Sequence, residues 1–377
     1  MSLKTTDVAI IGGGVVGCCL AYYLSAAGLS VTVIDRDQPG GQAPMLLAGI
    51  LAPSAEAGAP GPFCELGMAS YLHFPRIAAE LRQELSIDID LDQAGGVRVA
   101  WTDQTAQRLK DSERWERERG IDLTWLDGDD LRRLEPSLSP ELAGGLYTAL
   151  MSHVLTPRLI QGYIDSAARR GATFLAGHPA FGLRREGARI IGVDTPAGTI
   201  SAGHVIVSTG AWGGLYQEWL GAPLPIKPRK GQLMLVQTPP SQIRRAQRII
   251  YDGHNYMVPK RDGTVVIGAT EEDAAFDRRV TLDGLSFLTR MAARAIPSLA
   301  QAELRGSFAG FRPMPTDELP IIGLAPGTEN LIFATGHYRN GILLGPITGE
   351  LVTQIVRGET PSVDLQPFSP SRFSASQ

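Results

Sequence analysis

The sequence has little cysteine and no excess of positive charge. Its three cysteines, Cys18, Cys19 and Cys64, are too few for a disulfide framework, and the adjacent pair lies in an apolar run without metal-ligand spacing. The formal net charge is -4, so the chain lacks the basic field that attracts nucleic acid. We therefore expect reduced thiols packed as small apolar groups, and no nucleic-acid partner.

The chain also lacks a clear membrane span and a metal motif. Residues 8–30 carry no charge, but the glycine cluster inside this stretch and Asp7 before it argue against an export signal or an anchor. Neither H-E-x-x-H nor C-x-x-C occurs. The sequence predicts a cytoplasmic protein with no metal, no stable membrane insertion and a small-molecule partner.

Glycine, by contrast, is abundant. The 377 residues include 43 glycines, more than the usual share of about 7%. This excess favours tight turns and close approach of the backbone to a ligand. The length is too great for one hydrophobic core and suits two domains.

The most legible motif lies near the N-terminus. Residues 7–35 read as a buried strand, a glycine turn, an apolar helix and a second strand. Gly12, Gly14 and Gly17 fit G-x-G-x-x-G in this context: the first allows the turn, the second admits a pyrophosphate to the backbone, and the third lets helix and strand pack. The pattern predicts dinucleotide binding.

An acidic residue follows the second strand. Asp35 stands where a carboxylate accepts hydrogen bonds from ribose hydroxyls and would repel a 2'-phosphate. The dinucleotide is therefore FAD or NAD in preference to NADP. The alternative, a glycine-rich turn without a ligand, fits the flanking strands and the acid less well.

Further elements follow from periodicity and turn signals. Residues 64–85 and 280–299 are predicted to be helices. A third helix is predicted within 155–175, with Thr156 as its N-cap and Gly171 at its end, and 107–120 is predicted to be a charged, solvated helix. Strands around 255–270 alternate in the manner of an antiparallel sheet. The polar end from Pro367 is expected to be poorly ordered.

Several longer segments carry a resemblance. They are "IIGGGVVG" with Asp35, "LLAGILAP", "VIVSTGAWGG", "NYMVPKRDGTVVIGATEED", "FAGFRPMPTDELPIIG" and "ATGHYRNGILLGPITGE". In order and spacing the chain resembles the D-amino acid oxidase superfamily of FAD-dependent flavoproteins, and within it the glycine oxidases of thiamine biosynthesis. The last three segments are more specific than the glycine triplet.

The resemblance implies an α/β fold with an α+β second part. A Rossmann-like FAD-binding domain is expected to be interleaved with a substrate domain on an antiparallel sheet. Its boundaries are predicted at 1–85, 146–215 and 308–377 for the FAD domain, and at 86–145 and 216–307 for the substrate domain.

The implied activity is the oxidation of glycine, a similar small amine or a D-amino acid. A hydride leaves the α-carbon for the flavin, and O2 is reduced to hydrogen peroxide. The FAD is expected to be non-covalent, because relatives that link it use a later cysteine and none follows Cys64 here. A homo-oligomer is expected, since relatives are commonly tetramers.

The resemblance also implies the residues that bind substrate. Arg312 is expected to hold the carboxylate bidentately, as an arginine fork can, unless it instead pairs with a nearby acid such as Asp317 or Glu318. Tyr256 is expected to donate to the same carboxylate, and Arg339 to lie where flavin and substrate meet.

Two more polar residues are candidates for the substrate pocket. Glu271 stands where a close relative is apolar, so it is predicted to favour an ammonium group or a larger polar substrate. His254 and His337 are the nearest histidines, but hydride transfer from a neutral amine needs positioning more than a base, and neither is assigned as one.

The predicted cofactor residues come from the same segments. They are Gly12, Gly14, Val15, Val16, Gly17, Asp35, Arg36, Ala48, Gly49, Ile50, Ala180, Gly210, Trp212, Gly336, His337, Tyr338, Arg339, Asn340, Gly341 and Ile342. The last seven open an uncharged helix whose positive dipole end suits the flavin carbonyl that gains negative charge on reduction.

Two alternatives remain open. One is an amine or D-amino acid dehydrogenase that passes electrons to a quinone or a protein. The other is a nucleotide-binding module without catalysis, or part of a tRNA-modifying enzyme, which the acidic balance and the lack of a basic domain disfavour.

Overall fold

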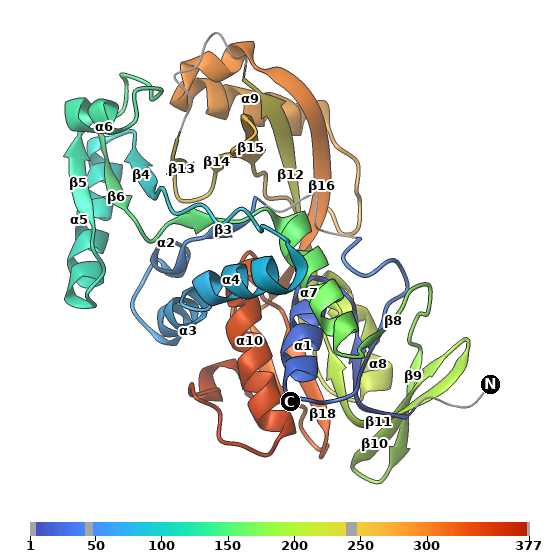
Figure 1. Ribbon diagram of the computed structural model, residues 1–377. Coiled ribbons are helices and arrows are strands. Elements are labelled where there is room, and N and C mark those ends of the chain that lie inside the picture. The colour runs from blue at the N-terminus through green and yellow to red at the C-terminus, as the bar shows by residue number, and fades with distance from the viewer. Residues whose placement is uncertain (1–4, 42–47, 239–246, 375–377) are drawn as a thin grey trace.

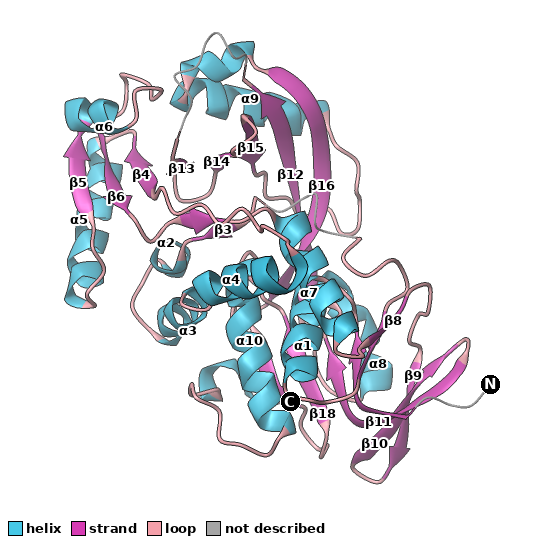
Figure 2. Cartoon of the chain, in the orientation of Figure 1, coloured by secondary structure: helices cyan, strands magenta, loops and turns pink. Residues whose placement is uncertain are grey.

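The computed structural model describes residues 5–41, 48–238 and 247–374. Two eight-stranded sheets organise it. Figure 1 shows the first sheet with α1, α7 and α10 in the lower half and the second sheet in the upper half, with β12 and β16 running down towards the first. Figure 2 shows α1, α7 and α10 in front of the strands of the first sheet, and α5 and α6 beside β5 and β6 of the second.

The first sheet is mainly parallel. Its order is β17-β18-β11-β1-β2-β8, with β10 and β9 added beside β11. The strands are β1 (Thr5–Ile11), β2 (Val31–Ile34), β8 (Thr173–Leu175), β9 (Gly182–Glu186), β10 (Arg189–Thr195), β11 (Gly198–Val207), β17 (Ile321–Leu324) and β18 (Leu331–Thr335). The apolar runs form parallel strands because both faces are buried, as expected for such a sheet.

Helices bury one face of this sheet. They are α1 (Val15–Ala26), α3 (Pro62–Tyr71), α4 (Phe74–Leu85), α7 (Thr156–Arg169) and α10 (Gly341–Val356). One apolar cluster joins them to β1, β2, β11 and β18, and a second lies on the other face. The short helix α2 (Pro53–Ala57) lies beside α3. α8 (Gln217–Leu220) adds to that second face. The short strands β3 (Ile50–Leu51) and β7 (Ser152–His153) pair separately.

The second sheet is mainly antiparallel. Its order is β16-β12-β15-β14-β13-β4-β6-β5. Its strands are β4 (Gly96–Ala100), β5 (Thr124–Asp127), β6 (Gly144–Thr148), β12 (Ile226–Gln237), β13 (Ile249–Tyr251), β14 (Tyr256–Pro259), β15 (Thr264–Gly268) and β16 (Glu303–Pro315), with helices α5 (Asp103–Glu118), α6 (Gly128–Leu134) and α9 (Leu282–Ala295). The predicted fold class is confirmed. The predicted boundaries at 145/146 and 307/308 fall inside β6 and β16.

Three local predictions were wrong. Residues 64–85 form two helices, because Pro75 lacks an N-H and its ring would meet the carbonyl of Tyr71 in a continuous helix. Thr156 is the first residue of α7, and Leu155 is the N-cap. The end of the chain has regular structure up to residue 373, because Phe368 and Pro370 bury the two short 3-10 turns there; residues 375–377 lie outside the described part.

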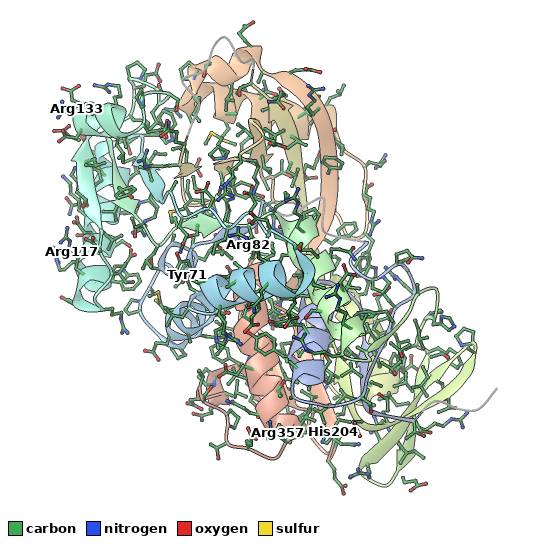
Figure 3. All side chains as sticks on the ribbon, viewed as in Figure 1. Tyr71, Arg82, Arg117, Arg133, His204 and Arg357 are labelled. Atoms are coloured by element: carbon green, nitrogen blue, oxygen red, sulfur yellow. The ribbon has the colours of Figure 1, made fainter. Side chains whose placement is uncertain are left out.

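The charged helix α5 lies at the periphery, as predicted. Figure 3 shows Arg117 of α5 and Arg133 of α6 at the outer edge of the molecule. Glu116 is an exception to the solvent exposure of α5: it is fully buried and pairs with Arg98 at 2.6 Å. Within the described residues, no helix is long and apolar enough to cross a lipid bilayer.

Candidate active site

One large cavity connects the two sheets. It is lined by the start of α1, the end of β2, the turn after β11, the segment 334–342 and parts of β12 and β16. All but one of the predicted cofactor residues line it: Gly12, Gly14, Val15, Val16, Asp35, Arg36, Ala48, Gly49, Ile50, Ala180, Gly210, Trp212, Gly336, His337, Tyr338, Arg339, Asn340, Gly341 and Ile342. Gly17 is the exception.

The three fingerprint glycines have different surroundings. Gly12 has a φ of 103°, and a Cβ on it would overlap the carbonyl of Ser208. A Cβ at Gly17 would overlap the carbonyl of Gly12, so Gly17 lets the helix approach the turn and does not face the cavity. A Cβ at Gly14 would meet no protein atom within 4 Å. The backbone is therefore open to a ligand at Gly14.

Helix α1 starts at this opening. Gly14 is its N-cap, no side chain caps its first N-H groups, and its first turn contains no acid. Unsatisfied N-H groups and the positive end of the helix dipole favour an anion at such a place. Because Gly14 has no side chain, the first N-H groups of α1 stay open to the cavity.

Asp35 lies beside the same turn. Its carboxylate accepts hydrogen bonds from the backbone N-H of Gly13 at 2.6 Å and of Asp37 at 2.7 Å. Burial raises the pKa of Asp35, while these two hydrogen bonds oppose the rise. The neighbouring Arg36 lies over the ring of Trp212, 4.3 Å from its centroid.

The segment around Gly49 runs close to its neighbours. Gly49 has a φ of 77°, and a Cβ there would overlap the carbonyl of Val154. Lys260 holds the segment, because its Nζ donates to the carbonyl of Ala48 at 2.8 Å and to that of Val154 at 3.2 Å. Burial lowers the pKa of Lys260 to about 8. Residues 42–47, which include the first two leucines of the "LLAGILAP" segment, lie outside the described residues.

Helix α10 begins at the cavity as predicted, one residue before Ile342. Asn340 is its N-cap, without a side-chain capping bond, and its first turn contains no acid. His337 is fully buried, its Nε2 lies 3.0 Å from Oγ1 of Thr348, and burial lowers its pKa to about 4. His337 is therefore neutral near pH 7.

Arg312 forms no ion pair within 4 Å among the described residues, although its charge helps to lower the pKa of the nearby Glu271. Its Nη1 donates to the carbonyl of Thr270 at 3.1 Å, whereas Asp317 pairs with Arg372 at 2.7 Å. A Cβ at Gly231 would lie 2.7 Å from the guanidinium nitrogens, so this glycine makes room for the arginine. The alternative that Arg312 pairs with Asp317 is excluded.

Tyr256 lies on the same face of the second sheet. A Cβ at Gly268, directly opposite on β15, would lie 2.5 Å from the tyrosine oxygen. Burial raises the pKa of Tyr256, and the charges of Arg312 and Arg339 oppose the rise. The hydroxyl stays protonated at neutral pH and can donate a hydrogen bond.

Arg339 has a partner that sequence reasoning missed. Its Nε lies 3.3 Å from Glu56 of α2, and its Nη2 donates to the hydroxyl of Tyr251 at 2.9 Å. Burial lowers the pKa of Arg339, but the Glu56 carboxylate and the neighbouring Tyr251, Tyr338 and Tyr256 together outweigh burial and raise the pKa overall. Both Glu56 and Arg339 line the cavity. No local pattern reveals this pair.

Two predicted substrate residues do not line the cavity. Glu271 accepts hydrogen bonds from the hydroxyl of Tyr338 and from Arg229 at 3.2 Å. Its charge is thus compensated beside the cavity. His254 lies on the exposed turn between β13 and β14, where its N-H donates to Asp252 at 3.1 Å. Neither residue lines the cavity, so a direct contact of Glu271 or His254 with the substrate stays a prediction that this geometry does not favour.

Unused polar groups remain inside the cavity. The hydroxyls of Thr209 and Thr335 are buried and have no hydrogen-bond partner within the described part of the chain, although both residues line the cavity. Buried hydroxyls are normally paired. Together with the open Gly14, they fit a long polar ligand better than an empty apolar groove.

The family follows from a comparison with known proteins. The model of the DAO family, described as FAD dependent oxidoreductase, matches residues 7–355. The chain belongs to this family of FAD-dependent oxidoreductases. Its cofactor is FAD, which fits the residues present: the ends of α1 and α10, the carboxylate of Asp35 and the two unpaired threonine hydroxyls.

Several relatives within the FAD-dependent oxidoreductases are similar over almost the whole chain. Glycine oxidase of Geobacillus kaustophilus is 34% identical over 97% of both chains, and its crystal structure gives a TM-score of 0.94 over 98% of this chain and 99% of that one. Hydrogen cyanide synthase subunit HcnC of Pseudomonas aeruginosa is 31% identical over 98% of this chain and 97% of the relative. Bifunctional protein ThiO/ThiG of Trichormus variabilis is 33% identical over 98% of this chain and 55% of its own length.

Proposed function

We propose that this protein is an amine oxidase that acts on glycine, a similar small amine or a D-amino acid. The observation that carries the proposal is Arg312, whose guanidinium forms no ion pair with the described residues and lines the same cavity as the fingerprint turn. Similarity to glycine oxidases supports glycine as substrate, and similarity to ThiO/ThiG supports a role in thiamine biosynthesis.

The substrate carboxylate binds to Arg312 and Tyr256. Arginine offers two parallel N-H donors, and the protonated tyrosine adds a third. Both residues lie on the face of the second sheet that carries the buried side chain of Leu233, which also lines the cavity. An apolar wall strengthens these polar contacts by excluding water.

Substrate orientation follows from this anchor. FAD, when bound, accepts the hydride of the α-carbon and returns its electrons to O2, which gives hydrogen peroxide. The chain holds the carboxylate at one end and leaves the amine free to lose its ammonium proton to solvent before the hydride moves. His337 is bonded to Thr348 and neutral, and His254 is exposed, so neither is placed as an obligatory base.

Arg339 is proposed to position the pocket. Because Glu56 compensates its charge, Arg339 does not compete with Arg312 for the carboxylate. Tyr338 lines the cavity beside Arg339, and its hydroxyl is held by a hydrogen bond to Glu271. We further propose a non-covalent flavin, a homo-oligomeric assembly, a cytoplasmic location, and the division into an FAD domain and a substrate domain.

One experiment tests this function. The purified protein is examined for a flavin spectrum and assayed for peroxide with glycine, sarcosine, D-alanine and D-proline. Turnover of glycine with peroxide release is expected. If substrate bleaches the flavin without air and air then yields no peroxide, the dehydrogenase alternative replaces the oxidase. If none of the four amines bleaches the flavin, the proposed substrate class is wrong.

A further inference from the structure

A loop of the second sheet reaches the nucleotide side of the cavity. Residues 271–280 connect β15 to α9 without regular structure. Backbone hydrogen bonds between Glu272 and Lys230 of β12, at 2.9 and 3.0 Å, fix the start of the loop, and their side chains pair at 3.2 Å. This anchor is firm, because the Lys230 side chain is buried.

Aromatic contacts fix the far end of the loop. Phe276 stacks on Trp212 with centroids 5.5 Å apart, and it meets Phe311 edge to face at 5.4 Å. Trp212 belongs to the short helix that follows β11, next to the glycine turn. The loop therefore rests on the wall of the cavity that carries the fingerprint.

Arg278 is the charged residue that the loop places there. It lines the cavity, and its guanidinium lies 5.9 Å from the ring centroid of Trp212 and 5.7 Å from that of Phe311. Its neighbour Arg279 pairs with Asp277 at 2.8 Å. Arg278 has no acidic partner within the described residues, so its charge is available to a ligand.

The face of the second sheet on which Arg278 lies indicates whether its ligand is the substrate or the cofactor. Phe311 and Arg312 are consecutive residues of β16 and point to opposite faces. Arg312 and Tyr256 share the substrate face, whereas Arg278 lies against Phe311 on the other. On that side Arg36 also lies over Trp212, and it is adjacent in sequence to Asp35, the predicted ribose acid.

We propose that Arg278 contacts the phosphates of FAD, so that the loop 271–280 fastens the nucleotide half of the cofactor from the second sheet. A dinucleotide brings two phosphate charges, and Asp35 adds a negative charge at the same end. An unpaired arginine on the opposite wall balances these charges. The inference rests on the cofactor of the family and is independent of which amine is oxidised.

The test measures flavin release from the holoenzyme. Wild type, Arg278→Ala, Arg278→Lys and Arg279→Ala are diluted, and the fluorescence of released FAD gives its Kd at several salt concentrations. Arg279→Ala is the matched control, since it removes a neighbouring charge that already has a partner. Thermal unfolding at saturating FAD confirms that each variant is folded.

Arg278→Ala is expected to raise the Kd of FAD at least about tenfold, the scale of one charge-assisted contact. The salt dependence of binding should flatten, Arg278→Lys should recover part of the affinity, and Arg279→Ala should match wild type. Activity that Arg278→Ala loses on dilution should return with added FAD.

Two results overturn the proposal. The first is an FAD affinity in Arg278→Ala within twofold of that in Arg279→Ala. The second is an unchanged FAD affinity together with a raised KM for a dicarboxylic amine such as iminodiacetate, which would place Arg278 in the substrate pocket. Either result would leave the oxidation of glycine itself untouched.

Discussion

The two walls of the cavity offer different kinds of group. The wall on the first sheet offers backbone: the uncapped starts of α1 and α10 and the turn at Gly12, with two threonine hydroxyls beside them. The wall on the second sheet offers long side chains, among them Arg312 and Tyr256. At Gly12 and Gly17 the backbone cradle has no room for a side chain, so changes there disturb the fold, whereas side chains on a sheet can be exchanged. Mutations should therefore separate the cofactor wall from the substrate wall.

The largest effect is expected at the glycine turn. Gly17→Val would drive a side chain into the carbonyl of Gly12, so we expect a loss of at least about 3 kcal/mol of stability and loss of bound FAD.

Gly14→Ala is expected to act on FAD binding alone, because residue 14 has open space around it and a φ of -71°. It should keep the fold while raising the Kd of FAD about tenfold. Thermal unfolding and flavin content check both variants; equal melting temperatures for the two would refute the distinction.

Arg312→Ala tests the opposite wall. Two charge-assisted hydrogen bonds of about 1.5 kcal/mol each predict a fall of about 100-fold in kcat/KM for glycine, with flavin retained. The control is Arg305→Ala on the same strand, where the arginine is half exposed and pairs with Glu303 at 3.3 Å. Steady-state kinetics should show wild-type values for that control. Unchanged kinetics in Arg312→Ala would remove the residue from its role.

Breaking the ion pair between Glu56 and Arg339 is expected to have a smaller effect, on the free energy of unfolding. Glu56→Gln leaves Arg339 without a compensating charge in a mostly buried site, where the side chains are 10% and 18% exposed. We expect a loss of about 2 kcal/mol in the free energy of unfolding. Glu65→Gln breaks the exposed pair with Arg119 and should cost less than about 0.5 kcal/mol. Urea unfolding at saturating FAD compares them, and equal losses would contradict the argument.

The smallest effect near neutral pH concerns His337. Its folded pKa, about 4, lies below its ordinary value of 6.5, so the unfolded chain binds the proton first as pH falls. The stability from a neutral His337 is complete above pH 6.5 and is lost towards pH 4, by up to about 3 kcal/mol. His337→Asn should flatten this part of the pH dependence relative to wild type. Parallel curves would show that His337 does not titrate as described.

Sequence reasoning succeeded where the signal is local. The fingerprint glycines, Asp35 and the start of α10 each lie within one short segment. All of them line the cavity except Gly17, which packs against the turn at Gly12. Pro75 was also a local signal for a helix break, but the periodicity around it concealed the break.

The remaining features depend on the tertiary structure. Glu56 and Arg339 are 283 positions apart, and no spacing in the chain predicts their contact. Proximity to a motif does not place a side chain in the cavity: Glu271 and His254 lie near specific segments, but Glu271 is bonded to Tyr338 and Arg229 and His254 is exposed. The direction of a side chain is set by strand pairing and turns, which a single sequence does not display.

The most direct test of the account uses a ligand that cannot react. Acetate has the carboxylate of glycine without its amine, so it should perturb the visible spectrum of the bound flavin saturably in wild type. In Arg312→Ala the flavin should remain bound and acetate should cause no saturable change. Equal acetate affinity in the two proteins would contradict the claim that Arg312 anchors the substrate carboxylate beside FAD.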